Sequence, residues 1–276
     1  MPDTDFQEAV EDLYADCERK AVAEQKELVS DSELIARWEA QAKAGGNACS
    51  TYVPLRTIQL LHAATHKLRV VHGPVQGGKS WGCHMDVILR CAQQSVCEDG
   101  IIRNRVLFAR NNYQQLKQTT FDMWMRMFPH TKIALSSPIQ GELEMRLGNR
   151  RSVIKLLGIP MEMQSAEATL RSNAFSMARV EEVQYIPWKR ITLMIERLGR
   201  YPDMAMAPKG CRVEGYFKNL GVTADTNMPV EGSWLYQRAQ VLKPENELYL
   251  FQPPAMFRTW DPLRKVWNYE ENRGQR

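Results

Sequence analysis

The feature that most constrains the fold is the segment Gly73–Ser80, which has the sequence GPVQGGKS. It fits the phosphate-binding pattern G-x-x-x-x-G-K-[ST] at every required position. Residues 67–72, just before it, favour a β-strand, and apolar side chains in residues 81–94 recur at helical spacing. A chance glycine-rich turn is the alternative interpretation. The strand and helix signals on either side favour a loop that binds a nucleotide.

The order of strand, glycine-rich loop and helix supplies what phosphate binding needs. Successive backbone N–H groups and the positive end of the helix surround the phosphates. Lys79 would reach the β- and γ-phosphates of ATP, and the Ser80 hydroxyl would ligate Mg²⁺. The residues that we expect to hold the nucleotide here are Gly73, Pro74, Val75, Gln76, Gly77, Gly78, Lys79 and Ser80.

Length and composition place the chain among ordinary globular proteins. It has 276 residues, of which 44% are hydrophobic and 25% charged, ample for one large α/β domain with an appendage. No apolar run reaches the ~18 residues that a membrane span requires, and the acidic, polar N-terminus is unlike a signal peptide. The six cysteines form no C-x-x-C pair and the five histidines make no ligand array. We therefore expect a reduced cytosolic protein without structural zinc.

The two ends of the chain differ in charge. Residues 1–50 carry 12 acidic and 5 basic side chains, a net −7, whereas the remaining residues carry 31 basic and 20 acidic ones, a net +11. A basic body suggests a polyanionic partner, although an ordinary solvated surface explains it equally well. Apolar residues recur at helical spacing over residues 5–43. We expect a helical N-terminal appendage over residues 1–48 and a P-loop ATPase domain over residues 49–276.

One glutamine, Gln59, stands ahead of the loop in a segment that favours a short helix. Its amide can both donate and accept a hydrogen bond, as recognition of the adenine edge requires. A surface glutamine without such a role is the simpler interpretation of this residue alone.

Further strand and helix signals alternate along the chain. Residues 105–110 are compactly apolar, and residues 114–128 follow with helical spacing, which indicates a βαβ unit in a parallel sheet. The last strand is expected at residues 247–252. Three short strands are expected in a hairpin or meander beside the sheet, at residues 132–135, 142–147 and 152–157. The fold class predicted is α/β, with a doubly wound, mostly parallel sheet flanked by helices.

Two acidic residues, Glu181 and Glu182, follow a core strand predicted over residues 174–180. In a P-loop ATPase, one acid at such a strand end holds Mg²⁺ through water, and the other polarises the water that attacks the γ-phosphate. The first acid is usually Asp, so Glu181 is a departure, and Arg179 is unusual inside such a strand. A charged first turn of a helix is the alternative.

A last polar strand end is predicted within residues 221–227. The small hydroxyl and amide groups of Thr223 and Asn227 could sense hydrolysis beside the γ-phosphate. A turn of the Asn-Pro type explains these residues about as well.

Taken together, the motifs resemble the N-terminal ATPase domain of large terminase subunits, the DNA-packaging motors of tailed phages. The resemblance covers roughly residues 50–272 and rests on the order of the motifs. They are Gly73–Ser80, Ala109-Arg110-Asn111, Phe128-Pro129, Val180-Glu181-Glu182, Gly199-Arg200-Tyr201-Pro202 and Thr223-Ala224-Asp225-Thr226-Asn227.

This resemblance implies a P-loop core in which hydrolysis of ATP, with Mg²⁺, drives double-stranded DNA through the portal into a procapsid. It implies as partners the portal protein, the small terminase subunit and further copies of the chain in a ring on the portal, without a membrane. The expected location is the host cell cytoplasm, transiently at the portal vertex. Carried over by position, Gln59 contacts adenine, Glu181 is metal-associated, Glu182 is the catalytic carboxylate, and Thr223 to Asn227 form the coupling motif.

Two departures from the family pattern change these expectations. Many terminases carry an arginine within the P-loop, whereas the variable positions here are Pro74, Val75, Gln76 and Gly77. An arginine must therefore come from elsewhere in the chain or from a neighbouring subunit. The candidates are Arg110, Arg171, Arg179 and Arg200, of which we assign Arg200 to catalysis. Family members also continue into an RNase H-like nuclease, and we expect no DNA cleavage by this chain, because few residues follow its last core strand.

Other functions remain open from the sequence. Another nucleic-acid-dependent translocase, such as a helicase-like motor, would separate strands, whereas a packaging motor moves intact duplex. An ATP-binding module that organises a ring would turn over little ATP alone. Basic residues expected near DNA phosphates, or simply solvated, are Arg103, Arg105, Lys117, Arg150, Arg151 and Lys155.

Overall fold

The computed structural model describes residues 52, 54–74, 77–136, 138–147, 150–253, 256–261 and 266–271. The chain divides into two compact units, one comprising residues 1–65, 71–79 and 250–276 and the other residues 66–70 and 80–249. The helices expected over residues 5–43, and the appendage expected over residues 1–48, lie outside the described residues.

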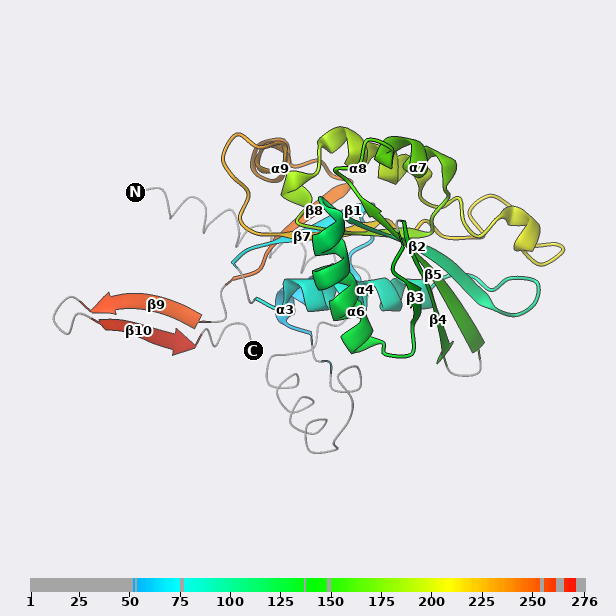
Figure 1. Cartoon of the computed structure of the whole chain (residues 1–276), viewed down its shortest axis with the longest axis horizontal. Coiled ribbons are helices and arrows are strands. Elements are labelled where there is room, and N and C mark those ends of the chain that lie inside the picture. The colour runs from blue at the N-terminus through cyan, green and yellow to red at the C-terminus, as the bar shows by residue number, and fades with distance from the viewer. Residues whose placement is uncertain are drawn as a thin grey trace, which may run out of the picture. The chain divides into compact units, whose positions relative to one another are not determined.

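The second unit is built on an eight-stranded sheet with the order β3-β4-β5-β2-β6-β7-β1-β8, to which β1 and β8 contribute residues 68–70 and 247–249 (Figure 1). β2 pairs in parallel with β5 and β6, and β6 pairs in parallel with β7, whereas β4 is antiparallel to β3 and β5. The strands are β1 (Leu68–His72), β2 (Ile102–Arg110), β3 (Lys132–Ala134), β4 (Ile139–Leu147), β5 (Arg150–Pro160), β6 (Met177–Glu181), β7 (Val222–Thr226) and β8 (Glu247–Phe251).

This sheet confirms the predicted fold class and its core strands, with two corrections. The strand expected at residues 152–157 is the longer β5, which pairs directly with β2 and so belongs to the sheet instead of lying beside it. Most of β5 is buried, as expected of a strand covered on both faces. The strand at residues 247–252 is not the last, because β9 (Met256–Asp261) and β10 (Val266–Glu271) form an antiparallel hairpin after the Pro253-Pro254 stop.

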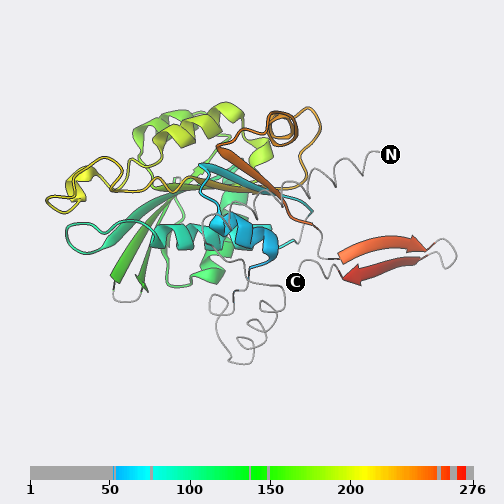
Figure 2. The same ribbon diagram turned by 180° about the vertical axis from the view of Figure 1, so that it is seen from behind.

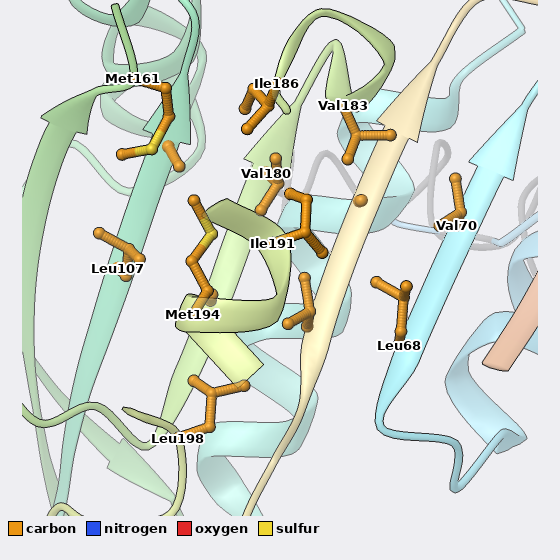
Figure 3. Packing of buried hydrophobic residues seen from close by; sticks show 14 of the residues in the cluster. Leu68, Val70, Leu107, Met161, Val180, Val183, Ile186, Ile191, Met194 and Leu198 are labelled. Atoms are coloured by element: carbon orange, nitrogen blue, oxygen red, sulfur yellow. The ribbon is translucent and has the colours of Figure 1, made fainter. Parts of the chain in front are cut away.

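One face of the sheet is apolar. It is covered by α7 (Ala166–Ser172), α8 (Trp188–Arg197) and α9 (Trp234–Tyr236), the last continuing as η4 (Gln237–Leu242) (Figures 1 and 2). Ile191 and Met194 of α8 lie over Val180, Leu107 and neighbouring strand residues (Figure 3). Each such fully buried side chain stabilises the fold by about 1.5–3 kcal/mol.

The opposite face is covered by α4 (Lys79–Ala92) and by the segment after β2 (Figure 1). That segment was predicted as one helix over residues 114–128. It is divided into α5 (Tyr113–Gln115), a π-helical turn η1 (Leu116–Phe121) and α6 (Asp122–Met127). Its start is capped by Asn112, whose side chain accepts a hydrogen bond from the backbone N–H of Gln115 at 2.8 Å. π-Turns inside helices are frequent at functional sites, and this one carries Thr120 into the polar layer described below.

The first unit holds α3 (Arg56–Ala63), the ends of β1 and β8, and the β9–β10 hairpin. Within it, the backbone N–H of Gln252 donates to the carbonyl of His72 at 2.7 Å, so the chain after β8 continues alongside the end of β1. Among the described residues, the helices are too short or too polar to cross a lipid bilayer.

Candidate active site

The glycine-rich loop is held tightly at its start. Gly73 has φ +151°, and a Cβ at this position would lie 2.2 Å from the carbonyl oxygen of Gln252, so only glycine fits. Gly78 has φ +73°, which also favours glycine. The Lys79 ammonium donates to the carbonyls of Gly73, at 3.0 Å, and Pro74, at 2.5 Å. Val75 and Gln76 lie outside the described residues.

Gln59, expected to contact adenine, is buried in the middle of α3. Its amide nitrogen lies 3.4 Å from the carbonyl of Pro54, a long hydrogen bond that holds the amide against the chain just ahead of the helix. His72, at the end of β1, is buried, and burial together with nearby Lys79 lowers the pKa of its imidazole to about 4. That histidine is therefore neutral at pH 7.

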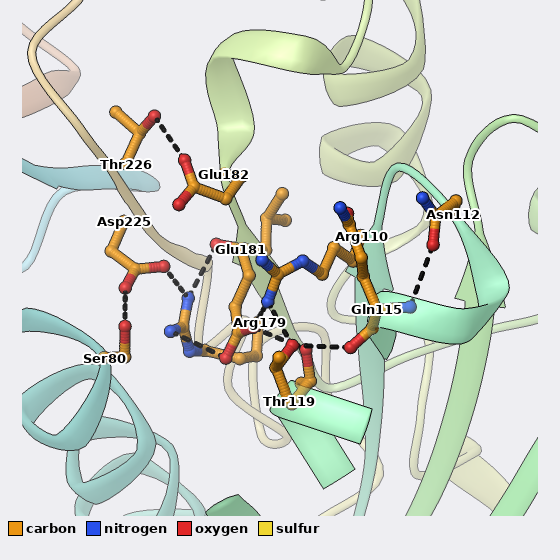
Figure 4. Close-up of polar contacts among 12 residues, drawn as sticks. Ser80, Arg110, Asn112, Gln115, Thr119, Arg179, Glu181, Glu182, Asp225 and Thr226 are labelled. Carbon is orange, nitrogen blue, oxygen red and sulfur yellow. Dashed lines mark hydrogen bonds and ion pairs between the residues drawn. The ribbon is translucent and has the colours of Figure 1, made fainter. Parts of the chain in front are cut away.

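In the second unit, Ser80 is the first residue of the chain to face an acid. Its hydroxyl donates a hydrogen bond to Oδ2 of Asp225, on β7 (Figure 4). Thr223, two residues earlier on β7, points to the same helix, because side chains alternate along a strand. The carboxylate opposite the serine hydroxyl thus comes from the motif that we expected to couple hydrolysis to movement.

Asp225 and Glu181 are direct partners in the parallel register of β7 and β6. Like charges directly opposite each other on neighbouring strands are destabilising. Arg179, fully buried on β6, compensates: its Nη1 lies 2.9 Å from Oδ1 of Asp225 and its Nη2 lies 3.4 Å from Oε1 of Glu181 (Figure 4). The arginine that was unusual inside a core strand is therefore the cation between two buried carboxylates.

Glu181 is further engaged on its other side. Its Oε2 is 2.7 Å from Nη1 of Arg110, at the end of β2, and accepts a hydrogen bond from the hydroxyl of Thr120 in η1. The imidazole of His84, on α4, lies 3.8 Å from Oε1. Two arginines and a hydroxyl hold this carboxylate, which faces β2 and η1.

The charges of this layer support one another. Burial raises the pKa of Asp225, but the Arg179 guanidinium and the Ser80 hydroxyl outweigh it, so the pKa lies below its ordinary value. Burial lowers the pKa of Arg179, and Asp225 more than restores it. Burial and Arg179 lower the pKa of His84, which is therefore neutral. The Asp225–Arg179 pair is ionised at neutral pH.

Glu182 follows β6 in a left-handed backbone conformation, with φ 50° and ψ 49°. A non-glycine residue there is strained by about 1–2 kcal/mol, and such strain clusters at functional sites. The strained turn directs the carboxylate to the end of β7, where Thr226 and Asn227 reach it through long hydrogen bonds of 3.4 and 3.5 Å. Burial, and then Asp225, raise the pKa of Glu182.

Thr223, expected at the nucleotide, is placed in a separate buried network below the site. Its hydroxyl donates to Oδ2 of Asp86, on α4, at 2.5 Å and accepts from Arg69 at 2.9 Å. Asp86 also pairs with Arg90 at 2.8 Å. Burial lowers the pKa of Arg69 to about 9, partly offset by Asp86. Thr223 therefore ties β7 to α4 and β1, and Thr226 and Asn227 are the residues of the motif at Glu182.

Arg200, assigned to catalysis from the sequence, is not brought to Glu182 within this chain. Leu198 pairs with Phe175, just ahead of β6, whereas Glu182 follows the other end of that strand. At ~3.3 Å per residue, the two ends are roughly 20 Å apart. The arginines that the fold does gather are Arg110 and Arg179, both among the sequence candidates, whereas Arg171 is exposed on α7.

The contacts of Asp225 and Thr120 were missed by sequence reasoning. Asp225 was included only as a member of the Thr223–Asn227 motif, and Thr120 was an unremarked helix residue. The departures at Arg179 and Glu181 were the available signal, because a buried arginine requires a second acid nearby.

Comparison with known proteins gives structural neighbours only. No protein-family model matches the chain, and no curated protein matches it. Two solved structures are similar in fold: the large terminase of a thermophilic bacteriophage, with 12% identity and a TM-score of 0.47, and the same protein in complex with ADP, with 12% identity and a TM-score of 0.41. Each match covers 68% of this chain and 40% of the terminase chain.

Proposed function

We propose that this chain binds and hydrolyses ATP with Mg²⁺, and that hydrolysis drives movement of double-stranded DNA in phage genome packaging. One observation carries the ATPase proposal. The P-loop sequence leads directly into α4, whose Ser80 faces a buried ionised carboxylate, while a strained Glu182 stands at the end of β6. A helix N-terminus for phosphates and acids at strand ends are what phosphoryl transfer requires.

The residues divide the work of hydrolysis between binding and chemistry. The backbone of Gly73–Lys79 and the Lys79 ammonium hold the phosphates and oppose their charge. The hard oxygens of Ser80 and Asp225 suit Mg²⁺, which when bound neutralises charge on the phosphate oxygens. Glu182 accepts a hydrogen bond from the attacking water and aligns it with the γ-phosphorus. Its raised pKa makes it a stronger base than an exposed glutamate.

The contacts of Glu182 with Thr226 and Asn227 support a role for β7 in coupling. Hydrogen bonds of 3.4 and 3.5 Å are weak, so Glu182 can exchange them for the water at little cost. When it does so, the end of β7 loses two partners. The loop after β7 then reports whether Glu182 is engaged in catalysis.

The DNA-packaging part of the proposal rests on the order of motifs from Gly73–Ser80 to Thr223–Asn227. With it come the portal protein, the small terminase subunit and a ring of identical chains as partners. A ring would also supply an arginine in trans, and Arg200, at the far end of β6, is exposed and available for that role.

The test is the steady-state rate of phosphate release against protein concentration, with and without duplex DNA. We expect the rate per chain to rise with concentration and with duplex, without strand separation. Lys79→Ala should abolish turnover and most ATP affinity, whereas Lys209→Ala, at an exposed lysine, should change neither. DNA-independent turnover, or unwinding of the duplex, would contradict the motor; turnover undiminished in Lys79→Ala would contradict the ATPase site.

A further inference from the structure

We propose that Asp225, and not Glu181, is the acidic residue that orients Ser80 toward the divalent cation of the nucleotide. The assignment rests on the proposed ATP-binding function. It reverses the expectation from sequence order, in which the first acid after β6 takes this role. The structure instead gives the role to the neighbouring strand.

The strand order explains why Asp225 is the nearer acid. β7 lies between β6 and β1, so it is one strand, ~4.8 Å, closer than β6 to the strand that leads into the loop and α4. An aspartate on β7 reaches the Ser80 hydroxyl directly. Its register partner Glu181 is one strand further away and turns toward Arg110 and Thr120.

The hydrogen bond itself prepares Ser80 for a cation. A hydroxyl has one proton and two lone pairs. Because the proton is donated to Asp225, the lone pairs of Ser80 face the loop side and can ligate a hard cation. An ionised Asp225 also leaves negative charge next to that ligand, and its lowered pKa keeps it ionised.

Charge balance separates the two acids in the same way. Glu181 is shared by two arginines, Arg110 at 2.7 Å and Arg179 at 3.4 Å, so little of its negative charge is left for another cation. Among the described residues, Asp225 forms its ion pair with Arg179, at 2.9 Å on Oδ1, and its Oδ2 faces Ser80. Glu181 and the two arginines therefore position Asp225, and Asp225 positions Ser80.

The experiment measures the affinity of a fluorescent ATP analogue with Mg²⁺ and with EDTA, so that no hydrolysis is needed. The ratio of the two affinities reports the metal response. In Asp225→Asn this ratio should fall by about 10- to 100-fold, the usual cost of a lost residue around a metal, while the affinity in EDTA stays near that of the wild type. Glu181→Gln should keep the ratio within about 3-fold, since its carboxylate does not contact Ser80.

Ser80→Ala is the matched partner, because it removes the same hydrogen bond from the other side. Its effect and that of Asp225→Asn should be non-additive, whereas effects of Ser80→Ala and Glu181→Gln should add. If Asp225→Asn does not fold, the double variant Asp225→Asn/Arg179→Met, which removes the buried cation with the anion, replaces it.

A metal response kept in Asp225→Asn, or lost equally in folded Glu181→Gln, would overturn the assignment while leaving ATP binding by the wild type intact. A wild type that binds no ATP analogue would overturn the proposed function and this assignment together. The two failures are thus distinguished by the wild-type measurement alone.

Discussion

Replacing Arg179 by methionine should destabilise the protein severely and in a pH-dependent way. Methionine keeps an unbranched apolar stem but removes the cation between Asp225 and Glu181. Breaking a buried ion pair by removing one partner costs about 3–5 kcal/mol, because it leaves an uncompensated buried charge. Glu181 keeps Arg110 and Thr120, so most of this cost falls on Asp225, which keeps only the Ser80 hydroxyl within this cluster.

The sign of the pH dependence follows from the Asp225 carboxyl. In the wild type its pKa is lowered, so its stabilising contribution is present above the ordinary value of 3.8 and is lost only as the pH falls through the lower folded-state pKa. Without Arg179, burial alone would raise this pKa. The variant would then lose stability as the pH rises, and its deficit relative to the wild type should shrink from pH 8 toward pH 5.

Equilibrium urea unfolding, followed by tryptophan fluorescence between pH 5 and 8, measures this deficit. A loss of about 4 kcal/mol corresponds to roughly 8–16 °C in the midpoint of thermal unfolding. Arg151→Met is the matched control, since Arg151 pairs with Glu144 at an exposed site and should contribute less than about 1 kcal/mol. Asp225→Asn should restore much of the stability of Arg179→Met. A deficit below about 1 kcal/mol, or one that does not depend on pH, would refute this reasoning.

Three further predictions concern single residues of the second unit. Glu182→Gly should unfold at higher urea than Glu182→Ala, by about 1 kcal/mol, because glycine adopts φ 50° without strain; equal stabilities would argue against a strained turn. The rate of hydrolysis should fall with decreasing pH at a pKa above the ordinary 4.5 of a glutamate, since burial and Asp225 raise that of Glu182; a rate that is constant down to pH 4.5 would exclude it as the base. Gly158→Ala should cost about 1–3 kcal/mol by urea unfolding, because the new Cβ would lie 2.6 Å from the Phe121 ring; an unchanged midpoint would show that η1 yields easily.

Local patterns predicted much of the fold. The strand before Gly73, the helix after it and the core strands β2, β6, β7 and β8 all follow from apolar runs ended by polar or turn residues. The β9–β10 hairpin was missed because two prolines after β8 suggested an end to regular structure. The π-turn at Leu116–Phe121 was also missed, since helical spacing does not distinguish one extra residue per turn.

The active-site acids show where sequence order stops being informative. Glu181 and Glu182 are adjacent in sequence, but a tight turn sends them to different partners, Arg110 and Thr226. Asp225 is distant in sequence but is the register partner of Glu181, and only the pairing of β6 with β7 shows this. Arg200 failed as a site residue within the chain for the same reason, since its motif lies near the start of β6.

The central claim is that Glu182 activates water at an ATP site formed by the P-loop sequence. The most direct test is to incubate the purified protein with ATP and Mg²⁺ and to identify the nucleotide that remains bound. The wild type should hold ADP, whereas Glu182→Gln should hold unhydrolysed ATP with near wild-type affinity. Conversion of bound ATP to ADP by Glu182→Gln at the wild-type rate would contradict the claim.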